Sequence, residues 1–198
     1  MAGQLPVLIA FGANIDPLDN LVRGLGLLHQ EIGIHRVSTV WRTCALSDPD
    51  QTSDDGENPD YLNGVVQLSH RVGNWHPLQL RRCLRGIEHR CGRTRESRRY
   101  AARTLDLDIA MMGSMVFAAD GLILPDPDVL SRPFIALPCA QLAPDLVHPH
   151  TNQTLATLAS TWPECSEAMA ADDVASRMLA SISLQDSWCP LRPGSLLG

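Results

Sequence analysis

The order of two hydrophobic periodicities constrains this chain more than any other feature of its sequence. Stretches in which apolar and polar residues alternate predict strands, and stretches with apolar residues three or four positions apart predict helices. The predicted strands span residues 5–11, 34–43, 61–70 and 104–112, and the predicted helices span residues 16–33 and 77–92. The order strand, helix, strand, strand, helix, strand predicts an α+β chain. Its topology would be the ferredoxin-like split βαβ, an antiparallel sheet with helices packed on one face.

Local signals mark the boundaries of several elements. Asp16 followed by Pro17 is typical of a helix start, with aspartate as the N-cap and proline at the first helical position. Gly33 is a natural stop for the same helix. Residues 12–14 are expected to form a turn before this helix, and residues 131–142 a further short helix.

A length of 198 residues suits one domain with an extension. Residues 1–152 contain all of the predicted sheet. Residues 153–198 are predicted to be an extension that is helical at 155–160 and 166–182 and then irregular. Residues 47–60 are acidic and rich in turn-forming residues, which predicts a surface loop.

The charge distribution argues against broad classes of partner. The net charge is −6, so general attraction to nucleic acid is not expected. No apolar run approaches the roughly 20 residues of a membrane span, and the first residues lack the basic region of a signal peptide. Six cysteines without a CxxC pair favour reduced thiols over zinc or disulfides. We therefore expect a cytoplasmic protein, a monomer or weak dimer, without nucleic acid or membrane partners.

The positive charge is concentrated in one stretch. All 16 basic residues are arginines, and nine of them lie between Arg81 and Arg103. Such a cluster in an acidic protein suggests a local site for a small, highly charged anion. A solvated helix face is the alternative, and we favour it for the first arginines of the stretch, Arg81, Arg82 and Arg85.

Two carboxylates follow the arginine-rich stretch. Asp106 and Asp108 are two positions apart in a predicted strand, so they share one face about 6.6 Å apart along the chain. Leu105, Leu107 and Ile109 would then face the core. Adjacent carboxylates repel each other unless a cation lies between them, and Mg²⁺ accepts one or two carboxylates together with water and phosphate oxygens. A solvent-facing strand with acidic residues is the alternative.

The neighbourhood favours phosphate chemistry. Five arginines precede the aspartate pair within about a dozen residues, and arginine binds phosphate oxygens with a planar, permanently charged fork. The five are Arg93, Arg95, Arg98, Arg99 and Arg103. No Walker loop is present, so metal and side chains would hold the phosphates.

The chain also resembles the 6-hydroxymethyl-7,8-dihydropterin pyrophosphokinase family over roughly residues 5–150. The resemblance rests on six ordered motifs, of which Arg-Thr-Leu-Asp-Leu-Asp is the most specific. They are Phe-Gly-Ala-Asn at 11–14, Trp-Arg-Thr at 41–43, Pro-Asp-Tyr-Leu-Asn at 59–63, Arg-Thr-Leu-Asp-Leu-Asp-Ile at 103–109, Arg-Pro-Phe at 132–134 and Leu-Ala-Pro-Asp-Leu at 142–146. The family transfers pyrophosphate from ATP to the hydroxymethyl group of the pterin, in folate biosynthesis.

The resemblance implies a role for each matching residue. Asp106 and Asp108 would hold two Mg²⁺ ions that bridge the ATP phosphates, and Arg93 and Arg103 would join them in catalysis. The nucleotide-binding residues would be Glu88, Arg93, Arg95, Tyr100, Arg103, Ile109 and Arg132. Tyr61 and Phe134 would sandwich the pterin ring, although core packing also explains two aromatic residues. Asn63, with the backbone from Thr43 to Leu46, would bind the polar edges of the pterin.

The chain departs from the family pattern on the nucleotide side. Asp126 stands where the family usually has histidine, and Tyr100 where it usually has tryptophan. These departures leave open a second hypothesis, a weakly active or inactive relative that binds pterin or nucleotide as a regulatory module. An unrelated metal-dependent nucleotidyl transferase would share the aspartate pair but would not explain Tyr61, Asn63 and Phe134 together.

Overall fold

A computed structural model of the chain describes residues 6–44, 59–69, 75–93, 103–162 and 169–184. Its main sheet is antiparallel and follows the order β5-β1-β4-β3-β8, with β2 also paired to β4. The strands of this sheet are β1 Val7–Ala13, β2 Ile34–Val37, β3 Trp41–Thr43, β4 Tyr61–Leu68, β5 Asp106–Met112 and β8 Met169–Ala171. The strands β6 Phe117–Ala119 and β7 Leu122–Leu124 form a separate hairpin. The expected α+β fold with an antiparallel sheet is confirmed.

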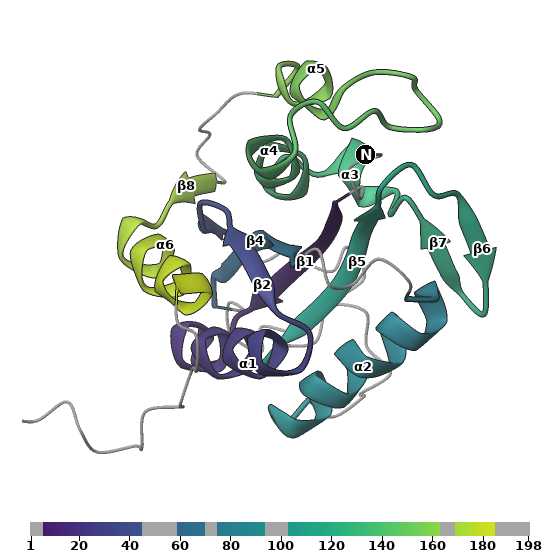
Figure 1. Ribbon diagram of the computed structural model, residues 1–198. Helices are drawn as coiled ribbons and strands as arrows, with labels where there is room; N and C mark the ends of the chain where they lie inside the picture. The colour runs from purple at the N-terminus through teal and green to yellow at the C-terminus, as the bar shows by residue number, and fades with distance from the viewer. Residues whose placement is uncertain (1–5, 45–58, 70–74, 94–102, 163–168, 185–198) are drawn as a thin grey trace, which may run out of the picture.

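Helices cover both faces of the sheet (Figure 1). The helices α1 Pro17–Glu31, α2 Pro77–Arg90 and α6 Asp173–Ala180 lie on one face, and α3 Asp128–Ser131, α4 Pro133–Leu142 and α5 Leu155–Ala159 on the other. The expectation that helices pack on one face alone was therefore wrong. Leu8, Val65 and Met111 on the second face are apolar and pack against α3, α4 and α5, which bury them.

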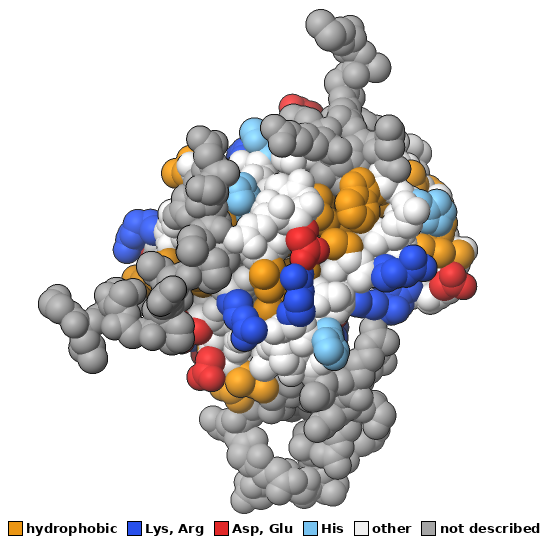
Figure 2. All heavy atoms as spheres, turned by 60° about the horizontal axis from the view of Figure 1, so that its bottom comes forward, with side chains coloured by type: hydrophobic (Ala, Val, Ile, Leu, Met, Phe, Trp, Pro, Cys, Tyr) orange, Lys and Arg blue, Asp and Glu red, His pale blue; other side chains and the backbone are white. Residues whose placement is uncertain are grey.

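The surface that faces the viewer in Figure 2 carries charges of both signs. Arginine side chains lie there beside acidic ones, with hydrophobic side chains between them. Among the described residues, no helix combines the length and the apolar character that a bilayer crossing requires.

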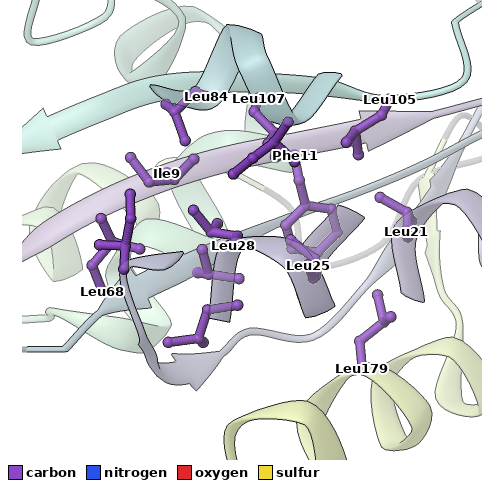
Figure 3. Close-up of a cluster of buried hydrophobic side chains, with 14 of the residues drawn as sticks. Ile9, Phe11, Leu21, Leu25, Leu28, Leu68, Leu84, Leu105, Leu107 and Leu179 are labelled. Atoms are coloured by element: carbon purple, nitrogen blue, oxygen red, sulfur yellow. The ribbon is translucent and has the colours of Figure 1, made fainter. Parts of the chain in front are cut away.

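The main core lies between the sheet and the helices α1 and α2. The close-up in Figure 3 shows Ile9, Phe11 and Leu107 of the sheet facing Leu25 and Leu28 of α1. The last two are fully buried, as their helical spacing predicts. Burial of each large apolar side chain stabilises the fold by roughly 1.5–3 kcal/mol.

The predicted strand at residues 34–43 is two strands, β2 and β3. Ser38 separates them because its main-chain N–H donates to the Val65 carbonyl at 3.0 Å while its hydroxyl accepts from the Val65 N–H at 3.0 Å. The serine side chain thus replaces a main-chain partner and interrupts the ladder. The alternation of apolar and polar residues at 34–43 does not reveal such a bond.

The start of the first helix also differs in detail from the prediction. Residues 12 and 13 belong to β1 and do not form the expected turn. Asp16 is the N-cap residue of α1, but its backbone is left-handed, with φ 39°, and its side chain makes no capping bond. Gly33 follows the helix with φ 96°, which glycine adopts without strain.

Two further helix predictions are partly wrong. Residues 131–142 do not form one helix, because Arg132 is extended between α3 and α4. Arg132 precedes Pro133, and the ring of a proline pushes the residue before it out of the helical region. The predicted helix at 166–182 contains β8, α6 and the 3-10 helix Ser181–Leu184 within its described part. The predicted helix at 155–160 is confirmed as α5.

Candidate active site

One row of residues crosses the sheet on the face opposite α1 and α2. Asp106 of β5 lies opposite Gly12 of β1, which lies opposite Asn63 of β4, which lies opposite Trp41 of β3. Directly opposite residues of antiparallel strands point to the same face. Asp108 lies two positions from Asp106 on that face. The structure therefore brings the predicted metal ligands and the predicted pterin-binding amide to one side of the sheet.

The two aspartates point away from the core, as predicted. Leu105, Leu107 and Ile109 are 0%, 3% and 2% exposed and belong to the main core. Asp106 is partly exposed and Asp108 is exposed. The alternation of β5 thus presents two carboxylates side by side on an accessible surface.

Asp106 is paired with two arginines. Arg93 follows α2, and its guanidinium contacts one carboxylate oxygen of Asp106 and also Oε1 of Glu88. Arg103 contacts the other oxygen of Asp106. Two positive and two negative side chains therefore neutralise one another where the sequence predicts bound phosphates.

Glu88 is buried beneath this network, at 4% exposure. Its Oε1 accepts a hydrogen bond from the Leu107 N–H at 2.8 Å, which joins α2 to the edge strand β5 between the two aspartates. Burial raises the pKa of Glu88, and the charge of Asp108 adds to this. The Leu107 N–H and Arg93 lower the pKa and oppose the rise. Glu88 thus holds both the strand and Arg93.

Asn14 is a site residue that sequence reasoning missed. The side chain is 2% exposed, and its Oδ1 accepts from the Arg103 N–H at 2.6 Å. Its N–H donates to the Arg103 carbonyl at 3.0 Å, and its Nδ2 donates to the Pro59 carbonyl at 3.4 Å. Asn14 therefore ties the start of β5 to the approach to β4. Its place in the Phe-Gly-Ala-Asn motif was the available signal, but the motif alone does not reveal these partners.

The side chains at the Asn63 end of the row are neutral. Asn63 donates from Nδ2 to the Thr43 hydroxyl at 2.8 Å, and both residues are buried. A side chain at Gly12 would place its Cβ 2.7 Å from Oδ1 of Asn63, so the glycine leaves the room that the amide occupies. Burial raises the pKa of Tyr61, while the nearby Arg103 and Arg93 lower it. Tyr61 thus lies between the neutral and the charged parts of the face.

Arg132 and Phe134 lie together where α4 begins. The Arg132 guanidinium is 5.9 Å from the centre of the Phe134 ring, and its Nε lies 3.5 Å from Oδ1 of Asp128. The Phe134 ring is partly exposed. Its stacking with Tyr61 around a pterin stays a prediction.

Asp126 caps the turn before α3. Its Oδ1 accepts from the Asp128 N–H at 2.8 Å, and its own N–H donates to the Ala110 carbonyl at 2.9 Å. Burial raises the pKa of Asp126 to about 6; the Asp128 N–H lowers it, and the charges of Asp128 and Asp108 raise it. The residue that replaces the family's histidine therefore has a local structural role near the aspartate pair.

The remaining predicted site residues are Leu46, Arg95, Tyr100 and Ile109. Leu46, Arg95 and Tyr100 lie outside the described residues. The Ile109 side chain is in the core, so a nucleotide could reach this residue only at its main chain on the edge strand. Within the described residues, no group of three or more His, Cys, Asp or Glu side chains is placed to hold a metal.

Comparison with known proteins identifies the family. Residues 8–144 match the family 7,8-dihydro-6-hydroxymethylpterin-pyrophosphokinase (HPPK). The chain belongs to this family. It is 34% identical over 164 residues to the 2-amino-4-hydroxy-6-hydroxymethyldihydropteridine pyrophosphokinase of Synechocystis sp., covering 78% of each protein. It is also 34% identical to the enzyme of that name from Haemophilus influenzae, covering 72% of this chain and 84% of that protein.

Solved HPPK structures share the fold. The chain superposes on wild-type Plasmodium falciparum HPPK-DHPS, solved with pterin and p-hydroxybenzoate, with a TM-score of 0.60 at 14% identity. The match covers 84% of this chain and 46% of that chain, so this chain spans less than half of the solved protein's length. The HPPK-like fold of the chain is thus supported by sequence and by structure.

Proposed function

We propose that this chain transfers pyrophosphate from ATP to 6-hydroxymethyl-7,8-dihydropterin, in folate biosynthesis, with Mg²⁺ bound at Asp106 and Asp108. The observation that carries the proposal is the row that puts these carboxylates, Gly12 and Asn63 on one face of the sheet. Family membership supports the enzyme class, an ATP-dependent diphosphokinase. In this reaction the pterin hydroxyl oxygen bonds to the β-phosphorus, the bond from that phosphorus to the α-phosphate oxygen breaks, and AMP leaves.

The donor set of the carboxylate pair fits Mg²⁺. Asp106 and Asp108 supply hard oxygen ligands from one face, and Mg²⁺ commonly combines one or two carboxylates with water and phosphate oxygens. Among the described residues, no third acidic or histidine side chain joins the pair. This suits a metal whose further ligands are phosphate oxygens of ATP. Mg²⁺, when bound, would neutralise the charge that develops on the transferred phosphates. We propose two ions, as the family resemblance implies.

Arg93 and Arg103 would bind the phosphates of ATP. Both arginines pair with Asp106 in the structure, so the guanidinium groups are held beside the carboxylate that would bind the metal. If Mg²⁺ and ATP bind together, Asp106 would be free to pair with the metal, and Arg93 and Arg103 to pair with the phosphates. Each charged side chain would then keep a partner of opposite charge, so no partly buried ion would be left unpaired. Glu88 would keep Arg93 in reach during this exchange.

The remaining nucleotide contacts are proposed from the family resemblance. Arg95 and Tyr100 would join Arg93 and Arg103, with Arg132 reaching the phosphates from the start of α4. Ile109 would contribute its main chain. The predicted role of Glu88 as a direct nucleotide contact becomes a supporting one, because its carboxylate is buried and bonded to Leu107.

The neutral end of the row would bind the pterin. Asn63 and Thr43 form a buried amide–hydroxyl pair that can read the polar edge of a flat heterocycle. Tyr61 and Phe134 would stack on the ring, and the backbone from Thr43 to Leu46 would bind its other polar edge. A pterin bound there would lie in line with Asp106, and we propose that its hydroxymethyl group lies nearest the phosphates.

A weakly active or inactive pterin- or nucleotide-binding relative is the second candidate, and Asp126 favours it. An acidic side chain near Asp108 adds negative charge where a triphosphate would bind. Calorimetry separates the candidates. Binding of a non-hydrolysable ATP analogue that requires Mg²⁺ supports the enzyme, whereas pterin binding without any Mg²⁺-dependent nucleotide binding supports the regulatory relative.

The direct test is incubation of the purified chain with ATP, Mg²⁺ and the hydroxymethyl-dihydropterin. AMP and the pterin diphosphate are expected in equal amounts, and Asp108→Ala protein should form neither. Absence of AMP under conditions where a relative of this family is active would overturn the proposal. The expected monomeric or weakly dimeric state and the cytoplasmic location stay predictions.

A further inference from the structure

We infer that residues 169–182, beyond the family match at 8–144, hold the strand β3 in place and so position the polar wall of the pterin pocket. This inference rests on the proposed function, because it assigns the pocket to the pterin. The residues that act here are positioning residues, and none of them lies among the predicted site residues.

The strand β3 has only three residues and depends on partners at both edges. Trp41, Arg42 and Thr43 pair with β4 on one side and with Ala171, Ala170 and Met169 of β8 on the other. Without β8, β3 would be a three-residue edge strand held by β4 alone. Short edge strands are the least stable members of a sheet. β8 therefore converts β3 into an interior strand.

The extension also satisfies both main-chain groups of Val40, the residue before β3. The Asp172 N–H donates to the Val40 carbonyl at 2.8 Å, and the Val40 N–H donates to the Ser176 hydroxyl at 2.8 Å. Ser176 in turn donates to the Asp172 carbonyl at 2.7 Å. Val40 is fully buried, so an unpaired N–H there would be costly.

Asp172 connects the strand to the helix that follows. Its Oδ2 lies 2.7 Å from the Arg42 guanidinium, and its Oδ1 accepts from the Ala175 N–H at 2.9 Å as the N-cap of α6. The Ala175 N–H, followed by Arg42, lowers the pKa of Asp172, while partial burial opposes this. One carboxylate thus contacts both the middle residue of β3 and the start of α6.

The helix α6 gives this connection a rigid base. Ala175, Leu179 and Ile182 are buried in the main core. Figure 3 shows Leu179 pointing toward Leu21 of α1. Because α6 is packed on α1, the bonds from Asp172 and Ser176 attach β3 to the core and not to a free tail.

The position of β3 sets the orientation of the predicted pterin-binding amide. Thr43 is the last residue of β3, and its hydroxyl accepts the Asn63 Nδ2 hydrogen bond. Because Thr43 holds Nδ2, Oδ1 of Asn63 lies over Gly12, on the side of Asn63 that leads along the row to Asp106. Movement of β3 would release the amide, weakening pterin binding while leaving the aspartate pair, Arg93 and Arg103 unchanged.

The test uses the full chain and the substitution Ser176→Ala. We expect the KM for the pterin to rise by about fivefold, the ratio that corresponds to one weakened hydrogen bond. The kcat and the affinity for a Mg²⁺-ATP analogue should change by less than about twofold. Ser176→Thr, which keeps the hydroxyl, should restore the pterin KM. Ser181→Ala is the matched control, because this serine lies in the same extension and its hydroxyl donates to the Met178 carbonyl of α6, one turn back along the chain.

Hydrogen exchange provides a readout that does not depend on activity. Amides in residues 38–44 should exchange about tenfold faster in Ser176→Ala than in wild type, with residues 106–112 unchanged. Unchanged exchange at 38–44 would overturn the inference, as would equal losses of pterin and nucleotide affinity. A wild-type chain that forms no AMP would overturn the proposed function instead, and the exchange data would still decide whether the extension holds β3.

Discussion

The two ends of the site row are built from different interactions. At the acceptor end, where the pterin would bind, Asn63 and Thr43 are neutral, buried and bonded to each other. At the donor end, where ATP would bind, Asp106, Arg93 and Arg103 are charged, and each is paired with an opposite charge. The acceptor end therefore owes its geometry to packing and hydrogen bonds. The donor end owes its geometry to ion pairs that binding of metal and phosphate would rearrange.

This difference predicts how substitutions at the two ends should act. A change at the donor end should alter kcat and metal dependence, because the charges there act on the transferred group. A change at the acceptor end should alter the pterin KM, because neutral contacts bind the pterin in the ground state and the transition state alike.

Removal of the exposed carboxylate should have the largest effect. Asp108→Ala should lower kcat by roughly 10³-fold, since metal-dependent stabilisation of charge is worth several kcal/mol. Circular dichroism and thermal unfolding should stay close to wild type, because the side chain is exposed. Asp19→Ala removes an exposed carboxylate from α1 and serves as the control. Activity of Asp108→Ala near the wild-type level would contradict the metal assignment.

Removal of one arginine should separate catalysis from metal binding. Arg93→Met should lower kcat by about 10²-fold through lost charge stabilisation. It should also strengthen binding of Mg²⁺ alone, because Asp106 loses one of its two competing guanidinium partners. Titration calorimetry without ATP measures this gain. Arg90→Met is the control, since Arg90 pairs with Glu31 away from the site. Weaker binding of Mg²⁺ alone to Arg93→Met would argue against the proposed exchange of partners.

Removal of the aromatic ring at α4 should affect the acceptor end. Phe134→Ala should raise the pterin KM by about tenfold, as expected for the loss of one stacking ring and its buried area. The affinity for the Mg²⁺-ATP analogue should change by less than about threefold. Phe117→Ala, which shortens an aromatic residue of the β6–β7 hairpin, is the matched control. A larger loss of nucleotide affinity than of pterin affinity would place Phe134 at the donor end.

The smallest effect should come from Asp126, through stability. Burial raises its pKa to about 6, so the folded chain binds this proton more tightly than the unfolded chain does. The resulting stability is present at pH below about 4 and is lost as the pH rises through 6. Asp126→Asn keeps an acceptor for the Asp128 N–H but carries no charge. It should raise the free energy of unfolding by about 1–2 kcal/mol at pH 7.5.

Urea unfolding at two pH values measures this change. The advantage of Asp126→Asn should shrink to less than half at pH 4.5, where the folded wild-type carboxyl is mostly protonated. An equal advantage at both pH values would contradict the raised pKa.

Much of the sheet could be predicted because its strands follow a simple alternation. The alternation at 104–112 placed Asp106 and Asp108 on the face away from Leu107, and the structure agrees. The helical spacing and the signals at Pro17 and Gly33 likewise marked α1. These elements are determined by contacts that repeat along the chain.

Features that depend on distant partners could not be predicted in the same way. Ser38 interrupts a strand through a bond to Val65, and β8 forms because residues 169–171 meet β3 across the sheet. Asn14 acts through Arg103 and Pro59. Such bonds join residues far apart in sequence, and no local pattern records them.

The central claim is that Asp106 and Asp108 bind the metal for pyrophosphoryl transfer, with Arg93 and Arg103 beside them. Product analysis tests this claim most directly. Phosphorus NMR can follow ATP, Mg²⁺ and hydroxymethyl-dihydropterin with the wild-type chain and with Asp108→Ala. We predict that the wild type forms AMP and pterin diphosphate in a one-to-one ratio and that Asp108→Ala forms neither. Formation of ADP in place of AMP, or equal turnover by both proteins, would contradict a pyrophosphoryl transfer centred on Asp106 and Asp108.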